Sequence, residues 1–193
     1  MPRLADPDPN TVPDDVREFL AQLPPDPMVK MLTHSVSTVK LFIQTAQAQF
    51  TSLALPARSR ELVTLTVAKC AECAFVASQH ESMSEAAGVD RRTRELIASG
   101  AFDSPELSAY DSTLIRFAAE VMARPRVSDE RFAQVRELLT EREIAEVLQV
   151  IGFYWSFCRV CTVLDVDFAQ PAGMTGASTS WTSATRPRAT GTS

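Results

Sequence analysis

Apolar residues recur at helical spacing along almost the whole chain, and this periodicity limits the folds that are open to it. One clear stripe consists of Val39, Phe42, Ile43, Ala46 and Phe50. No run of about four to eight residues shows the alternating β-branched and polar side chains that are typical of a strand. We therefore expect an all-α fold.

Capping residues and prolines define the expected helix boundaries. Ser35 is placed to cap a long helix, Pro56 opens the next one, and Thr140 with Glu143 forms a capping box. Asp90 is placed to cap a short helix, and Gly100 is the stop signal of that helix. About eight helices are predicted, with approximate ranges 14–23, 35–50, 56–70, 72–87, 90–99, 107–123, 129–139 and 140–163.

The two ends of the chain differ in composition from its centre. Residues 1–13 contain four prolines, and residues 171–193 are mostly Ser, Thr, Ala, Gly, Pro and Arg. We expect a flexible N-terminal extension at 1–13 and a disordered C-terminal tail at 171–193. Residues 14–170 are then one helical domain, because a chain of 193 residues supports one ordinary core.

Charge and hydropathy exclude some partners. The formal net charge of −5 argues against nucleic acid, which requires a basic face. The longest apolar stretch, 147–158, is too short for a membrane span and lies between Glu146 and Arg159. The N-terminus has acids and prolines where a secretory signal would be apolar. We expect a cytoplasmic protein with a small-molecule partner, whose cysteines are reduced, catalytic or metal-binding rather than paired in structural disulfides.

Residues whose side chains could take part in a reaction are concentrated between positions 60 and 81. Eleven residues separate Glu61 from Cys73, and six separate Cys73 from His80. This segment, with Gly88-Val89 after it, resembles the carboxymuconolactone decarboxylase and alkylhydroperoxidase D superfamily, and the resemblance covers about residues 28–168. It implies a fold built around a hairpin of the 56–70 and 72–87 helices. It also implies a homo-oligomer, commonly a trimer or hexamer.

The resemblance distinguishes two branches of this superfamily. In the peroxidase branch a glutamate is followed by eleven residues, a Cys-x-x-Cys pair, three residues and a histidine, so the second cysteine falls on Val76. Cys73 remains, but it lies about 10.5 Å from His80 along an intact helix at ~1.5 Å per residue, which is too far for a direct hydrogen bond. The sequence is therefore more similar to the non-peroxidase branch, although it has alanine where that branch often has an acid and a tryptophan.

The first functional hypothesis is cofactor-independent proton transfer. His80 would be the general acid/base, oriented by Glu61 across the hairpin. Cys73 would line the pocket, and we expect Phe75, Val76 and Tyr154 to be pocket residues. The substrate would be a small organic acid, lactone or carbonyl compound, which is decarboxylated or isomerised. No metal or organic cofactor is required.

Two further hypotheses remain open. Cys70 and Cys73 form a Cys-x-x-Cys pair, which suits a thiol peroxidase with Cys70 as the resolving partner, although two buried small side chains would give the same pattern. The third hypothesis is a non-catalytic ligand-binding or assembly protein, in which Glu61 and His80 lie out of mutual reach.

Other candidate residues have less specific patterns. Cys158 and Cys161 form a second Cys-x-x-Cys pair inside the last helix, where core packing explains them better than a four-cysteine zinc site. Arg58 and Arg60 are suited to hold a substrate carboxylate, but helix-surface arginines are more often solvated or engaged in interchain pairs. His34 is expected in a loop.

Overall fold

The computed structural model describes residues 2–166, and the predicted tail at 171–193 lies outside these residues. Over this range the chain is helical and has no strand, which confirms the all-α prediction. The elements are η1 (Pro9–Thr11), α1 (Asp14–Leu20), α2 (Pro27–Leu32), α3 (Val39–Thr51), α4 (Ala57–Cys70), α5 (Ala74–Ala86), α6 (Arg91–Ser99), α7 (Ala109–Ala123), α8 (Asp129–Arg136) and α9 (Glu141–Val163).

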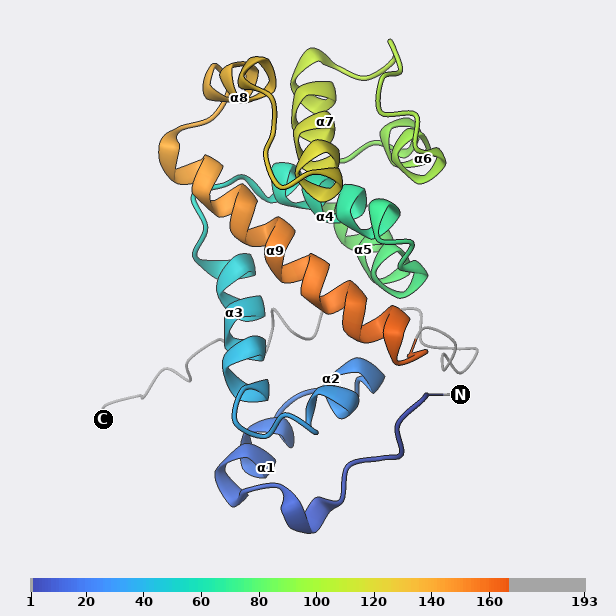
Figure 1. The fold of residues 1–193 in the computed structure, drawn as a ribbon, viewed down its shortest axis with the longest axis vertical. Coiled ribbons are helices and arrows are strands. Elements are labelled where there is room, and N and C mark those ends of the chain that lie inside the picture. Colours follow the sequence, from blue (N-terminus) through green and yellow to red (C-terminus); the bar gives the residue numbers. More distant parts are fainter. Residues whose placement is uncertain (1, 167–193) are drawn as a thin grey trace, which may run out of the picture.

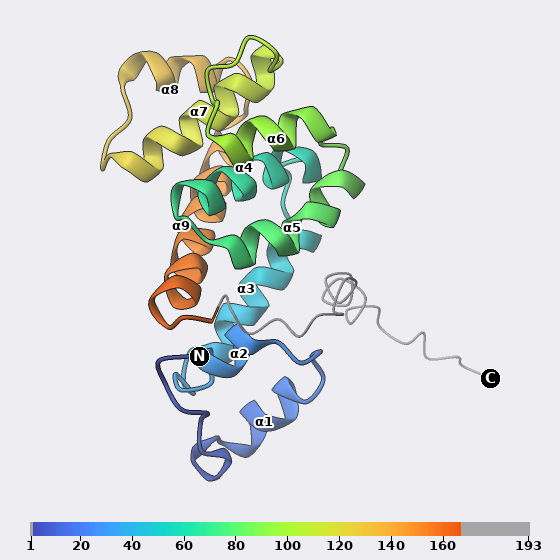
Figure 2. The same ribbon diagram turned by 90° about the vertical axis from the view of Figure 1, so that its right-hand side faces the viewer.

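The helix α4 is the centre of the fold. It packs against α5, α6, α7 and α9, and its residues from Ser59 to Ala68 are all buried. The long helix α9, orange in Figure 1, crosses the molecule beside it. In both views α1 and α2 lie at one end, whereas α7 and α8 lie at the other (Figures 1 and 2). Polar residues on α4 are therefore enclosed and need partners inside the protein.

Most predicted helix ends are confirmed by their hydrogen bonds. Asp90 accepts a bond from the Thr93 amide at the start of α6, and Gly100 ends that helix in the left-handed conformation at φ 80°. Thr140 and Glu143 form both bonds of the predicted capping box of α9. The prediction fails at Ser35, because its hydroxyl bonds the Thr38 hydroxyl and α3 begins only at Val39.

Some of residues 2–13 contact the helical domain, and the flexibility of this extension stays a prediction. Arg3 donates a backbone hydrogen bond to the Leu164 carbonyl and forms an ion pair with Asp165. Val12 is only 7% exposed. Prolines prevent a regular helix here, but they do not prevent an extended segment from being held by side-chain and backbone contacts.

By length and composition alone, α9 is long and apolar enough to cross a membrane. In this structure it packs against α2, α4, α5, α7 and α8. It also carries Glu146, which is 8% exposed and whose carboxylate accepts the Leu55 amide at 2.7 Å. A core helix of a soluble protein satisfies the same criteria of length and composition.

Candidate active site

A buried carboxylate and imidazole join the two helices of the predicted hairpin. Glu61 on α4 is 0% exposed and His80 on α5 is 5% exposed. The His80 Nδ1 atom lies 2.7 Å from Glu61 Oε2. A carboxylate only accepts hydrogen bonds, so Nδ1 carries a proton, and in the neutral form of the ring the lone pair is on Nε2. The structure thus brings together the two residues that the first hypothesis requires.

Arg60 is the second partner of Glu61. Its guanidinium donates to Glu61 Oε1 from Nη2 at 3.0 Å and from Nε at 3.2 Å, and it lies over the Phe50 ring at 4.3 Å from the ring centroid. Burial acts to raise the pKa of Glu61, but the charges and hydrogen bonds of His80 and Arg60 outweigh it and hold this pKa below its ordinary value. Glu61 is therefore ionised at neutral pH, and Arg60 is not available to hold a substrate.

His80 opens onto a small aromatic pocket of about 70 Å³. The pocket lies among α3, α5, α9 and the start of α2, and its lining includes Asp26, Phe50, Phe75, His80, Tyr154 and Phe157. The rings of His80 and Tyr154 pack in a T-shaped arrangement, with ring centroids 5.0 Å apart. No residue between 2 and 166 forms a hydrogen bond with Nε2. In the neutral tautomer set by Glu61, Nε2 is therefore the basic nitrogen of the ring.

Only some of the predicted pocket residues line this pocket. Phe75 and Tyr154 line the pocket, whereas Val76 does not and is buried in the core at 1% exposure. Val76 follows Phe75 directly on α5, so the two side chains point about 100° apart around the helix. Cys73 also lies outside this pocket.

Asp26 is a pocket residue that the sequence reasoning missed. Its Oδ1 atom caps α2 by accepting the amides of Met28 at 2.8 Å and Val29 at 3.0 Å. Burial raises the pKa of Asp26, although these two amide bonds act to lower it. The Asp-Pro sequence is a visible capping signal, but only the long-range packing of α2 brings it beside His80.

We expect Asp26→Asn to be more stable than wild type at pH 7. The raised pKa means that the folded state favours the protonated carboxyl, so ionised Asp26 destabilises the fold at neutral pH. Asparagine keeps the cap without the charge. Urea denaturation should therefore show a stability gain at pH 7 that shrinks as the pH falls through the folded-state pKa. A loss at pH 7 would contradict the raised pKa.

The cysteines are arranged differently from the predicted redox pair. Cys70 is exposed, while Cys73, Cys158 and Cys161 are buried. The Cys73 thiol is hydrogen bonded with Cys158 and Cys161 of α9, and not with Cys70. The interpretation of Cys158 and Cys161 as buried residues is confirmed, but their meeting with Cys73 was not predicted. Within residues 2–166, no group of three or more metal-ligating side chains is arranged to hold a metal ion.

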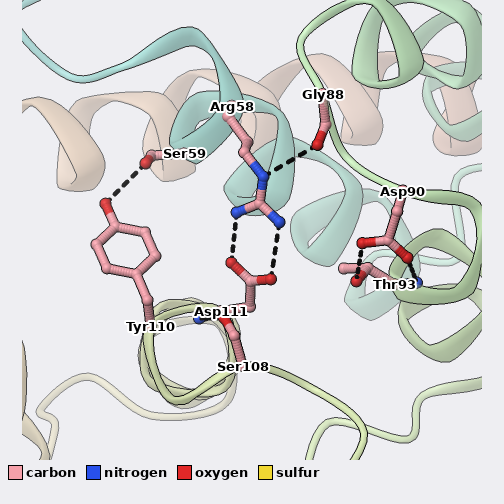
Figure 3. A network of polar contacts seen from close by, with 8 residues as sticks. All are labelled: Arg58, Ser59, Gly88, Asp90, Thr93, Ser108, Tyr110 and Asp111. Carbon is pink, nitrogen blue, oxygen red and sulfur yellow. Dashed lines mark hydrogen bonds and ion pairs between the residues drawn. The ribbon is translucent and has the colours of Figure 1, made fainter.

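Arg58 also has a structural role (Figure 3). It donates to both oxygens of Asp111 on α7, at 2.5 and 2.8 Å, and to the Gly88 carbonyl after α5 at 3.1 Å. Beside it, the hydroxyls of Ser59 and Tyr110 are 2.7 Å apart. Asp111 is 3% exposed at its side chain, and its hydrogen bond is the largest cause that raises the pKa of Arg58. These bonds fix α4 against α7 and the end of α5.

Comparison with known proteins identifies the fold. No protein-family model and no curated protein matches the sequence. An uncharacterised peroxidase-related protein from Ralstonia eutropha with the alkylhydroperoxidase AhpD core superposes with a TM-score of 0.71 at 16% identity, over 94% of this chain and 96% of that one. A peroxidase-related protein from Silicibacter sp. gives 0.69 at 19% identity, over 85% and 90%.

A third similar structure is that of an enzyme. The debrominase Bmp8, in complex with 2,3,4-tribromopyrrole, superposes with a TM-score of 0.65 at 12% identity, over 86% of this chain and 92% of that one. Taken with the helical architecture around α4, these similarities show that the chain has the alkylhydroperoxidase D-like fold.

Proposed function

We propose that this protein is a cofactor-independent enzyme that transfers a proton on a small lactone, organic acid or carbonyl compound, with His80 as the general acid/base. One observation carries the proposal: the buried hydrogen bond of 2.7 Å between Glu61 and His80, a residue that lines the pocket. An imidazole oriented by a carboxylate transfers protons near neutral pH.

The contacts support a specific sequence of proton movements. His80 Nε2 takes a proton from the carbon beside a carbonyl, which leaves an enolate on the substrate and an imidazolium on the enzyme. Glu61 stabilises that imidazolium, while Arg60 holds the carboxylate in place at 3.0 Å. Return of the proton to a different carbon gives isomerisation. Decarboxylation starts instead from the imidazolium form of His80: a carboxylate on the carbon beside the carbonyl leaves as carbon dioxide, and the electron pair of the broken C–C bond forms the enolate. The Nε2–H of His80 then protonates that carbon, and solvent returns a proton to Nε2.

The lining of the pocket favours substrates without a strong negative charge. Its lining residues include no lysine or arginine. The two nearby arginines of α4, Arg58 and Arg60, form ion pairs with Asp111 and Glu61. Asp26 adds an acid to the pocket instead. The rings of Phe50 and Phe157 suit a flat apolar body. Lactones and uncharged carbonyl compounds therefore fit the pocket better than carboxylates with two charges.

Proton exchange with solvent deuterium tests the proposal before the natural substrate is known. A panel of small lactones and ketones is incubated with the enzyme in D₂O, and deuterium at the carbon beside the carbonyl is measured by NMR. We expect catalysed exchange for some members, and a loss of about a hundredfold in His80→Ala, the lower end of the contribution of general acid/base catalysis.

His34→Ala is the matched control. His34 is the other of the two histidines of the chain. It is exposed, lies 2.9 Å from the Ala5 carbonyl and does not line the pocket. Exchange that is equally fast in wild type and His80→Ala would contradict the proposal. So would a loss in His34→Ala as large as that in His80→Ala.

The alternatives retain less support from the geometry. Glu61 and His80 are in contact, although a non-catalytic protein was expected to hold them apart. A thiol peroxidase using Cys73 with Cys70 would need those two sulfurs together, whereas Cys73 is bonded to thiols of α9. Similarity to peroxidase-related proteins supports redox chemistry as a second candidate function, and the buried thiols are its basis.

We also propose a cytoplasmic homo-oligomer, a trimer or hexamer. Large apolar side chains are exposed on two neighbouring helices, namely Leu41 on α3 at 62%, and Leu148 and Trp155 on α9 at 44% and 48%. Burial of such side chains against a second copy would stabilise an assembly. Light scattering on the purified protein gives the number of subunits.

A further inference from the structure

The wall of the aromatic pocket is a connected series of rings. The ring centroid of Tyr154 lies 5.0 Å from that of His80 and 6.1 Å from that of Phe157. Phe157 in turn lies 6.3 Å from Phe75, and Phe50 lies 6.4 Å from His80, measured in the same way. All five rings line the pocket, and they come from α3, α5 and α9. A molecule in the pocket therefore meets aromatic side chains from three helices.

Asp26 gives this aromatic wall a negative charge. It is the one carboxylate among the lining residues, which include no lysine or arginine. Its Oδ1 atom accepts the amides of Met28 and Val29. In the part of the chain that the structure describes, its Oδ2 atom accepts no hydrogen bond and Asp26 has no ion-pair partner. The carboxylate therefore lacks a counter-charge.

The surroundings of Asp26 make that missing charge important. Burial raises the pKa of Asp26, so an ionised carboxylate at this position is unfavourable unless a cation accompanies it. The guanidinium of Arg60 does lie over the Phe50 ring, at 4.3 Å from the ring centroid, but it is paired with Glu61. The neutral form of His80, which acts as the base, adds no positive charge. A cation for Asp26 has to come from a ligand.

A ring-lined pocket with one carboxylate suits a positively charged organic ligand. Aromatic faces attract cations within about 6 Å of the ring centroid, and ammonium ligands are recognised by several rings together. A carboxylate adds to this attraction, most strongly where water is excluded. The pocket volume of about 70 Å³ holds roughly five to seven waters at about 10–15 Å³ each. The ligand is therefore a compact ammonium ion and not a long cationic chain.

We propose that the aromatic pocket binds a small organic ammonium ion between its rings and Asp26, and that the natural substrates are carbonyl compounds that carry such a group. The ammonium group would fix the substrate so that the carbon beside its carbonyl faces His80. The assignment of the substrate class rests on the proposed function of His80, whereas binding of the cation does not.

Choline and 3,3-dimethylbutan-1-ol test the binding site. The two molecules have the same shape and the same number of non-hydrogen atoms, but only choline is charged. Their dissociation constants with the full-length protein are measured at pH 7 by NMR titration. We expect choline to bind about tenfold more tightly than the alcohol, because the rings and Asp26 act on its charge.

Three variants define the roles of the carboxylate and of the rings. Asp26→Asn keeps the cap of α2 but removes the charge, so it should weaken choline about tenfold and leave binding of the alcohol unchanged. Asp90→Asn is the matched control, because Asp90 also caps a helix, through the Thr93 amide at 2.9 Å, but does not line the pocket. It should bind choline as wild type does. Phe157→Leu replaces a ring by an aliphatic side chain and should weaken choline roughly threefold, and the alcohol less.

Deuterium exchange then tests the substrate class. The two ketones (2-oxopropyl)trimethylammonium and 4,4-dimethylpentan-2-one again differ only in charge, and each catalysed rate is divided by the rate without enzyme. Asp26→Asn should slow exchange of the ammonium ketone, through a higher KM, and leave that of the neutral ketone unchanged. His80→Ala should slow exchange of both.

The possible failures can be told apart. Choline that binds no more tightly than the alcohol, or equally well to wild type and Asp26→Asn, would overturn the ammonium site, and exchange of neutral ketones would be unaffected by that result. Loss of choline binding in Asp90→Asn as large as that in Asp26→Asn would overturn it too. Binding of choline that depends on Asp26, without catalysed exchange of any ketone, would overturn the proposed function and the substrate class but leave the binding site established.

Discussion

Replacing Glu61 with alanine lowers the free energy of unfolding by about 3–5 kcal/mol, the range expected when one partner of a buried ion pair is removed. Glu61 is 0% exposed and accepts hydrogen bonds from Arg60 and His80. The alanine variant leaves the guanidinium of Arg60, at 8% exposure, without its carboxylate. Urea denaturation of wild type and variant at pH 7 measures the difference.

The Glu106→Ala variant is the control for this change. Glu106 also binds an arginine, Arg92, at 2.6 and 2.8 Å, but both side chains are more than half exposed. Exposed ion pairs contribute little because water screens them, so this variant should unfold at nearly the wild-type urea concentration. Equal losses in the two variants would show that burial is not the cause.

The effect of Glu61 has a defined pH dependence. Its folded-state pKa lies below the unfolded value of 4.5, so the carboxylate contributes stability that is fully present above that pH. This contribution is lost as the pH falls through the folded-state pKa. The gap in stability between wild type and Glu61→Ala should therefore be constant near neutrality and narrow in acid.

The second large effect is expected for Arg58→Met, which should lower the free energy of unfolding by about 3 kcal/mol. The change leaves Asp111, 3% exposed at its side chain, as an unpaired buried carboxylate. We expect the lower end of the range for buried pairs because Arg58 itself is 34% exposed. The variant also removes a hydrogen bond to the Gly88 carbonyl, and urea denaturation at pH 7 again gives the magnitude.

Two further variants make this second prediction specific. Arg92→Met removes the same two-bond geometry from an exposed pair and should have little effect. Arg58→Lys keeps the charge but loses the fork that contacts both Asp111 oxygens, so its stability should lie between those of wild type and Arg58→Met. A lysine variant as unstable as the methionine variant would mean that geometry alone, and not charge, is responsible.

The fold could be predicted wherever the signal is local. Asp90, Gly100 and the Thr140–Glu143 pair cap helices through neighbours in the sequence, so their roles were visible without the structure. Ser35 shows where this reasoning fails. Its hydroxyl bonds that of Thr38 and not a backbone amide, so the helix begins later than the capping preference indicates.

The candidate site was predictable only in part, because most of its contacts join distant segments. The meeting of Glu61 and His80 follows from a hairpin of adjacent helices. The pairing of Arg60 with Glu61 could not be predicted in this way. Consecutive residues on a helix point about 100° apart, and an arginine side chain is most often solvated. Asp26 and the thiols of α9 reach their partners through packing that no local pattern encodes.

The position of α9 at the end of the helical domain has a consequence for folding during synthesis. Phe153, Tyr154 and Phe157 of this helix complete the pocket, yet the ribosome makes them after helices α1 to α8. Until then the apolar and charged faces of α4 lack a main packing partner. We expect the nascent chain to remain partly folded and dependent on chaperones, because native contacts between distant segments form only when both have emerged.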